Sequence, residues 1–166
     1  MKVIVCAAIL ASGFAGPVLA ETSWYASRED GHWCRYPTEK AWMASKGNES
    51  ATVDRRKDRI VAIHINESDD GGDWTANDAY GVGESALIAL ERRYTTFDYG
   101  EVALAESWRR DGNHWVRTQR RLTDISGDHV RKDNPDVVYP FEKVERLADF
   151  GFAKLIGGEV KATICL

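Results

Sequence analysis

Two tryptophans in the second half of the chain each stand close to an arginine. Trp108 directly precedes Arg109, and Trp115 lies two residues before Arg117. A tryptophan ring offers a large flat apolar surface, and tryptophan and arginine are both enriched where proteins bind partners. We therefore expect these four residues to form an exposed binding platform. The alternative is structural, because a cross-strand tryptophan pair also holds two strands in register.

Clustered carboxylates at Asp69, Asp70 and Asp73 are the second chemical feature. Calcium takes several oxygen ligands from flexible, carboxylate-rich loops, so this segment is a candidate for a calcium site. The spacing does not fit an EF-hand, and Gly71 and Gly72 inside the cluster are typical of a turn. A solvated surface turn is the favoured interpretation, and we expect no bound cofactor.

Catalytic signatures are sparse in this sequence. The four histidines form no metal-binding pair, and no nucleophile motif of the common hydrolase families is present. Acid and base groups from distant strands can still converge in a fold, as in a small hydrolase that uses His64 or His114. The leading hypothesis is a non-catalytic binding module of the periplasm or cell envelope, and the hydrolase is its rival.

The first twenty residues have the pattern of a cleavable signal peptide. Lys2 supplies a positive start, residues 3–11 are apolar, and residues 16–20 combine a helix break with small side chains that suit a signal peptidase. The apolar run is about half the length needed to cross a bilayer. The sequence thus predicts export, with residues 21–166 as the working protein in the periplasm or outside the cell.

Two cysteines remain after this cleavage, Cys34 and Cys165, because Cys6 leaves with the signal. An even number of cysteines in an oxidising compartment predicts a disulfide, here one that ties the two ends of the exported chain together. Two free thiols are the alternative.

Length and charge limit the partners of the exported chain. Removing 20 residues from 166 leaves 146, enough for a single domain, and the loss of Lys2 leaves 21 basic against 26 acidic residues, a net charge of −5. That balance argues against nucleic acid, which needs a basic stripe. No later apolar run is long enough for a membrane span. The expected partner is a protein or another envelope component.

The elements that position these residues are mainly strands. Residues 50–54 and 59–67 are expected to be strands joined by a charged turn, and in the second one Val61, Ile63 and Ile65 alternate with other residues. Residues 84–94 are assigned to a further strand. Strands in succession, without regular β-α-β alternation, predict an antiparallel α+β domain with one or two packed helices.

The clearest local signal is a hairpin over residues 101–122, with Asp111 and Gly112 as a two-residue turn. This turn places Trp108 opposite Trp115. One face then carries Val102, Leu104, Glu106 and Trp108 with Trp115, Arg117, Gln119 and Arg121, and the other carries Ala103, Ala105 and Ser107 with Val116. The pattern does not decide which face is buried.

Two helices and a final strand complete the prediction. Residues 38–46 are expected to be helical with Thr38 as the N-cap. Residues 141–157 have helical spacing, with Val144, Leu147 and Ala148 on one side. Residues 159–166 alternate between apolar and polar side chains and are expected to form the last strand.

Overall fold

The computed structural model describes residues 20–44, 48–132, 136–159 and 163–165. The predicted signal peptide, residues 1–20, lies outside the described residues except for Ala20, so its cleavage stays a prediction.

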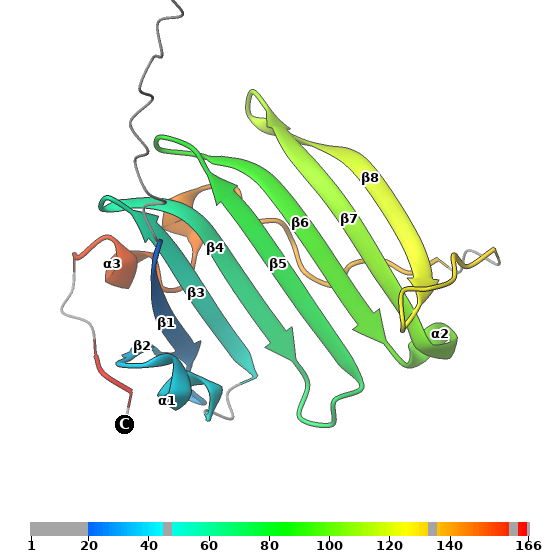
Figure 1. Ribbon diagram of the computed structural model, residues 1–166, viewed down its shortest axis with the longest axis horizontal. Coiled ribbons are helices and arrows are strands. Elements are labelled where there is room, and N and C mark those ends of the chain that lie inside the picture. Colours follow the sequence, from blue (N-terminus) through cyan, green and yellow to red (C-terminus); the bar gives the residue numbers. More distant parts are fainter. Residues whose placement is uncertain (1–19, 45–47, 133–135, 160–162, 166) are drawn as a thin grey trace, which may run out of the picture.

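Eight antiparallel strands form a single sheet (Figure 1). They are β1 (Glu21–Ser27), β2 (Trp33–Tyr36), β3 (Glu49–Arg56), β4 (Arg59–Ser68), β5 (Trp74–Val82), β6 (Leu87–Thr96), β7 (Val102–Asp111) and β8 (His114–Asp124). Their order across the sheet is β2-β1-β3-β4-β5-β6-β7-β8, so from β3 onward each strand pairs with the next one in the chain. Short connections allow only antiparallel pairing of consecutive strands. The predicted antiparallel sheet is confirmed.

Helices contribute little to this structure. They are α1 (Glu39–Met43), α2 (Asp98–Glu101), α3 (Ala153–Ile156) and the 3-10 turn η1 (Leu147–Asp149), and none of them contains a buried residue. The predicted N-cap of the first helix is confirmed, because the Thr38 hydroxyl accepts a hydrogen bond from the backbone N–H of Ala41. No helix of the described segments is long and apolar enough to cross a membrane.

Side chains alternate between the two faces of the sheet, as the pleat of a strand requires. Val53, Ile63, Tyr80 and Leu90 are cross-strand neighbours on β3 to β6, and all four are buried on one face. We call this the covered face. The opposite face carries the alternate residues, among them His64, and we call it the open face.

Residues 136–156 cross the covered face and lie behind β4 to β7 in the view of Figure 1. We call this segment the strap. Phe150 and Phe152 of the strap are buried, and the ring of Phe152 stacks on Tyr25 with centroids 5.6 Å apart. The ring of Phe150 meets Tyr80 edge-on at 5.3 Å. The strap therefore supplies the second layer that the sheet needs to bury its apolar face.

Two hydrophobic clusters occupy the covered face. The larger one consists of Tyr25, Ala51, Val53, Ile63, Tyr80, Leu87, Leu90, Phe150 and Phe152. The smaller one consists of Val102, Leu104, Leu122 and Val137. The strap contributes to both clusters, so both depend on its position.

The predicted helix over residues 141–157 is wrong for most of its length, since only η1 and α3 are helical there. The backbone of the strap bonds to side chains of the sheet instead. The N–H of Val144 donates to the Tyr80 hydroxyl at 2.9 Å, and the carbonyl of Val144 accepts from Trp115 Nε1 at 3.3 Å. In a helix the same N–H and carbonyl groups would form hydrogen bonds within the helix, so a helical strap could not make these bonds to the sheet.

Strands β7 and β8 form the predicted hairpin, but its register differs from the prediction. Asp111 pairs with His114, which moves the turn one residue along the chain to Gly112 and Asn113. Trp108 consequently lies opposite Arg117, and the predicted pairing of Trp108 with Trp115 is wrong.

A β-bulge in β8 also changes which residues share a face. Ser107 pairs with Gln119 and Trp108 with Arg117, which leaves Thr118 as the extra residue. Beyond this point every side chain of β8 changes sides, because one inserted residue reverses the alternation. Gln119 and Arg121 therefore lie on the open face, contrary to the prediction. Val102, Leu104, Glu106 and Trp108 lie on the covered face.

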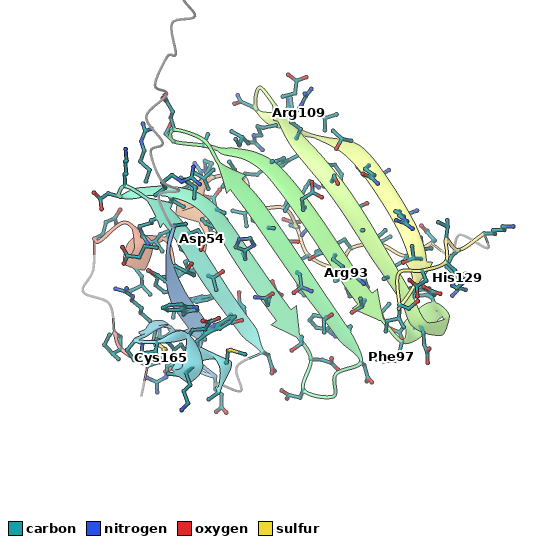
Figure 2. The ribbon with its side chains drawn as sticks, in the orientation of Figure 1. Asp54, Arg93, Phe97, Arg109, His129 and Cys165 are labelled. Atoms are coloured by element: carbon teal, nitrogen blue, oxygen red, sulfur yellow. A yellow bond between two sulfur atoms is a disulfide. The ribbon has the colours of Figure 1, made fainter. Side chains whose placement is uncertain are left out.

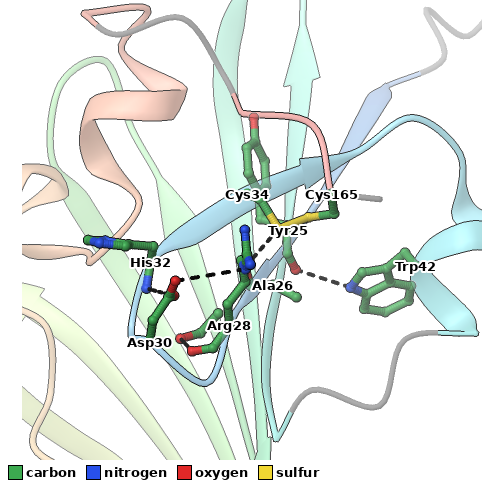
Figure 3. The surroundings of a disulfide bond; sticks show 9 residues. Tyr25, Ala26, Arg28, Asp30, His32, Cys34, Trp42 and Cys165 are labelled. Atoms are coloured by element: carbon green, nitrogen blue, oxygen red, sulfur yellow. Dashed lines mark hydrogen bonds and ion pairs between the residues drawn. A yellow bond between two sulfur atoms is a disulfide. The ribbon is translucent and has the colours of Figure 1, made fainter.

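Cys34 and Cys165 form the predicted disulfide, with Cα atoms 5.3 Å apart (Figure 3). Only part of the predicted final strand, residues 159–166, is described. Within it, Ile164 forms a parallel bridge with Arg35 of β2, and the Arg35 N–H donates to the carbonyl of Thr163 at 2.9 Å. The chain end thus pairs with the β2 edge of the sheet beside the disulfide.

Gly151 tests the position of the strap. A Cβ atom at this residue would lie 2.6 Å from Nε1 of Trp33, a ring already packed on Phe152 at 4.6 Å. We predict that Gly151→Ala lowers the free energy of unfolding by about 1–3 kcal/mol, the usual range for overpacking. Urea denaturation followed by tryptophan fluorescence measures this change.

Gly81→Ala is the matched control for Gly151→Ala. A Cβ atom at Gly81 would meet the Cβ of Ala89 at an ordinary 3.4 Å. Equal unfolding free energies of the two variants would contradict the described contact between the strap and Trp33.

Candidate binding site

A row of charged side chains crosses the covered face. Asp78 on β5, Arg92 on β6, Glu106 on β7 and Arg120 on β8 are successive cross-strand neighbours. We call them the charged row. Their signs alternate, which stabilises pairing of adjacent strands. The row runs between the two hydrophobic clusters.

Asp78 and Arg92 form a buried, bidentate ion pair. Nε and Nη2 of Arg92 donate to the two carboxylate oxygens at 2.9 and 2.8 Å, and the Asp78 and Arg92 side chains are 10% and 2% exposed. Desolvating such charges costs several kcal/mol each, so the pair needs further hydrogen bonds. The Tyr139 hydroxyl supplies one to Asp78 at 2.6 Å, and the Tyr80 hydroxyl a longer one at 3.3 Å.

The protonation states of this cluster follow from burial and charge. Burial and the nearby negative charge of Asp78 raise the pKa of both Tyr80 and Tyr139, so both remain neutral donors. Burial disfavours the charge of Arg92, but the hydrogen bonds and charge of Asp78 outweigh it and raise the pKa of Arg92. Arg92 is therefore a permanent cation under the strap.

The charged row binds the backbone of the strap. Nη2 of Arg92 donates to the carbonyl of Glu142 at 3.3 Å, and its guanidinium lies 3.6 Å from the ring centroid of Tyr139. Nη2 of Arg120 donates to the carbonyl of Val137 at 3.1 Å. The strap is thus both the cover of the row and a source of its hydrogen bonds.

Glu106 is held by three neighbours on β7 and β8. Its side chain is 7% exposed, Oε1 lies 2.9 Å from Nη1 of Arg117 and 4.0 Å from Nε of Arg120, and Oε2 accepts from Nε1 of Trp108 at 3.2 Å. Its negative charge is therefore already balanced within the protein.

A cavity of about 530 Å³ lies between this part of the sheet and the strap. We call it the strap pocket. Its lining residues from the sheet are Arg92, Glu106, Trp108, Arg117 and Arg120, and those from the strap are Asp136, Val137, Val138, Tyr139, Phe141 and Lys143. Both elements are required to form it.

Positive charge exceeds negative charge in the strap pocket. Four cationic residues line it against two carboxylates, Glu106 and Asp136. Nζ of Lys143 lies 4.1 Å from the ring centroid of Trp108, and the Arg117 guanidinium lies 5.6 Å from the same ring. Cations beside an aromatic wall match an anionic group that is joined to a flat or apolar part.

The structure brings together only part of the predicted binding platform. Trp108 and Arg117 share the strap pocket. Trp115 lies beside it on the covered face, where Tyr80 packs on it edge-on at 6.3 Å and the guanidinium of Arg110 lies 4.9 Å from its ring. Arg109 pairs with Val116 on the open face, so the structure does not bring it together with the other three residues.

Several site residues escaped the sequence analysis. The sequence alone did not show that Asp78, Arg92 and Arg120 belong to one row. They are cross-strand neighbours, and their register depends on the turns and on the bulge at Thr118. One signal was present: Asp78 and Arg92 stand at inward positions of alternating strands, between Ala76 and Tyr80 and between Leu90 and Tyr94. An inward charge on each of two neighbouring strands predicts a buried pair.

Two of the three carboxylates in the candidate calcium loop have structural partners. Asp69 accepts a hydrogen bond from the backbone N–H of Trp74 at 3.0 Å, and Asp70 accepts from Nδ2 of Asn48 at 2.6 Å. Asp73 accepts at its backbone carbonyl from the N–H of Phe97 at 3.0 Å. In the described part of the chain, no three His, Cys, Asp or Glu side chains are grouped so that they could hold a metal ion.

A search of protein families, of curated proteins and of solved structures finds no match to this chain. The geometry of the strap pocket and of the sheet therefore provides the evidence on function.

Removing one partner of the buried ion pair tests the charged row. We predict that Asp78→Asn lowers the free energy of unfolding by about 3–5 kcal/mol, because Arg92 is left buried without its counter-charge. The double variant Asp78→Leu with Arg92→Met recovers most of this loss, since it removes both desolvated charges. Urea denaturation measures both values, and a cost below ~1 kcal/mol for Asp78→Asn would show that the pair is not buried as described.

A carboxylate pair at the end of the covered face makes the stability depend on pH. Glu49 and Glu67 are direct cross-strand partners on β3 and β4. Burial and the charges of Glu49 and Asp78 raise the pKa of Glu67 from 4.5 to about 7, against the opposing charge of Arg92. Burial also raises the pKa of Glu49. The folded protein therefore binds more protons than the unfolded chain between these pH values.

The sign of the effect follows from this proton uptake. The contribution of Glu67 to the free energy of unfolding is complete below pH 4.5 and is lost as the pH rises toward 7. The loss is on the order of 1–2 kcal/mol, because the partial solvent exposure of this side chain reduces the effect. Glu67→Gln flattens this slope, whereas Glu91→Gln on the open face keeps it. Thermal melting of both variants between pH 4.5 and 7.5 measures the difference, and equal slopes would refute the assignment to Glu67.

Proposed function

We propose that residues 21–166 act as a non-catalytic binding domain, exported to the periplasm or the cell exterior, whose strap pocket holds an anionic group of a protein or envelope component. The observation that carries this proposal is the pairing of an excess of cations with the aromatic wall of Trp108 in the strap pocket. Arg117 is the most accessible of its arginines, with 48% of its side chain exposed. An incoming anion would therefore reach Arg117 before Arg92 or Arg120.

The disulfide supports an oxidising location for this domain. Cys34 and Cys165 form a disulfide. Disulfides persist in exported proteins and are rare in a reducing cytosol. The disulfide also agrees with the signal peptide expected from residues 1–20.

The contacts of the histidines favour binding over hydrolysis. His64 lies on the open face, where Nε2 is 3.5 Å from Asp54, and the Thr22 hydroxyl donates to that same carboxylate at 2.7 Å. The hydroxyl is thus bonded to the carboxylate and not to the imidazole, so the contact that activates a nucleophile is missing from this group. His114 pairs with Asp111 at the hairpin tip, away from the strap pocket.

Phenyl phosphate is a suitable probe of the strap pocket, because it joins an anion to a flat ring. We predict that it shifts the Nε1–H resonance of Trp108 in a nuclear magnetic resonance titration, whereas benzyl alcohol and benzylamine shift it much less. Arg117→Gln weakens phenyl phosphate binding at least fivefold by removing an accessible cation. Arg59→Gln, at a side chain that is 70% exposed in the β3–β4 hairpin, leaves it unchanged.

The titration separates anion binding from simple ring binding. Equal affinity for benzylamine and phenyl phosphate would reject the proposed ligand class. Binding that survives Arg117→Gln would place the anion elsewhere on the protein.

A further inference from the structure

The open face is the surface that Figure 2 presents to the viewer, with the strap behind the strands and Arg93 among the labelled residues. Two adjacent cross-strand rows fill its centre. One row is Thr52, His64, Ala79, Glu91, Ser107 and Gln119, and the other is Ser50, Asn66, Asn77, Arg93, Ala105 and Arg121. On β3 to β8 neither row has an apolar side chain larger than alanine, so the centre of the face lacks the anchors by which protein partners usually bind. Toward β1 and β2 the first row continues to Trp24 and Tyr36.

Arg93 and Arg121 flank Ala105 in the second of these rows. Ala105 pairs with Arg93 on one side and with Arg121 on the other. Neighbouring strands lie about 4.8 Å apart, so the two arginine backbones stand about 9–10 Å apart with only a methyl group between them. Within the described residues neither guanidinium has a hydrogen-bond or ion-pair partner. The row therefore contains a notch with a cation on each side.

A shallow cavity of about 290 Å³ continues from this notch toward β4. Its open-face lining residues are His64, Asn66, Asn77, Ala79, Glu91, Arg93 and Ala105. Ala79 and Ala105 form a low floor because their side chains are short. Glu91 is held in place, since it accepts a hydrogen bond from the Ser107 hydroxyl at 2.6 Å.

The amides of Asn66 and Asn77 keep their hydrogen-bonding capacity. They are direct cross-strand partners, and within the described residues neither side chain makes a hydrogen bond. Each amide offers two donors and an acceptor, which suits a ligand with many hydroxyl groups. The rigid sheet holds them in fixed positions, so little order is lost when they bind.

We propose that the open face binds a segment of an acidic polysaccharide, with sugar hydroxyls over Asn66 and Asn77 and a sugar carboxylate in the notch between Arg93 and Arg121. The arginines supply the charge complementarity, and the amides supply contacts that a simple anion could not use. An acidic peptide is the competing occupant, because its backbone can also bond to the amides, and tetraglutamate represents it in the test. A nucleic acid strand would need a longer stripe of cations than these two arginines.

This site is separate from the strap pocket, because Arg93 and Arg92 are consecutive residues on opposite faces of β6. The two proposals can therefore fail independently. Arg117→Gln disturbs the strap pocket, and Arg93→Gln disturbs the open face.

The test uses tetragalacturonate as the probe and isothermal titration calorimetry as the measurement. We predict that the wild-type protein binds it, that binding weakens with added salt, and that the fully methyl-esterified tetramer, which has the same sugars without the charge, binds at least tenfold more weakly. Arg93→Gln and Arg121→Gln each reduce the affinity at least fivefold. Arg117→Gln and Arg59→Gln leave it unchanged, and circular dichroism with thermal melting verifies that each variant is folded.

Four outcomes would overturn this proposal. They are the absence of binding to the wild-type protein, full binding by the folded variant Arg93→Gln, equal affinity for tetraglutamate, and self-association of the protein that Arg93→Gln abolishes. Equal affinity for tetraglutamate would show that the site binds any flexible polyanion through charge alone and does not recognise sugars. Self-association would make a second copy the occupant of the open face.

Discussion

The buried ion pair between Asp78 and Arg92 is the interaction on which the rest of the structure depends. Two charges at the centre of a sheet face are tolerated only when every polar atom has a partner. Arg92 takes its remaining contacts from the Glu142 carbonyl and the Tyr139 ring, and Asp78 takes a hydrogen bond from the Tyr139 hydroxyl. These partners belong to the strap. The need to satisfy the pair therefore fixes where the strap crosses the sheet.

The position of the strap in turn creates the candidate site. Once Tyr139 and Val137 are held against the charged row, the strap covers the half-exposed ends of β7 and β8 without filling the space above them. Lys143 and Arg117 then both lie near the Trp108 ring. The same polar contacts that stabilise the fold leave a cation-rich, aromatic-walled pocket at the margin of the core.

The two faces of the sheet differ in character, although both result from the same alternation of side chains along the strands. The covered face buries apolar side chains and compensates its charges internally. The centre of the open face has small and polar side chains, and within the described residues no carboxylate forms an ion pair with Arg93 or Arg121. Because adjacent residues of one strand point in opposite directions, Arg92 and Arg93 have entirely different surroundings despite being consecutive. One is a structural cation and the other is available to a ligand.

Local patterns in the sequence determined the strands at residues 50–67, the Thr38 cap and the Cys34–Cys165 disulfide, because alternation, capping and cysteine pairing are read from few residues. Expectations that needed contacts distant in sequence were less successful. Residues 141–157 have helical spacing but are mostly not helical, because the backbone of Val144 forms hydrogen bonds with Tyr80 and Trp115, which are distant in the chain. A single bulge at Thr118 reversed the faces of Gln119 and Arg121. Only the tertiary structure could decide these points, because cross-strand register and the path of the strap are set by partners that no local pattern identifies.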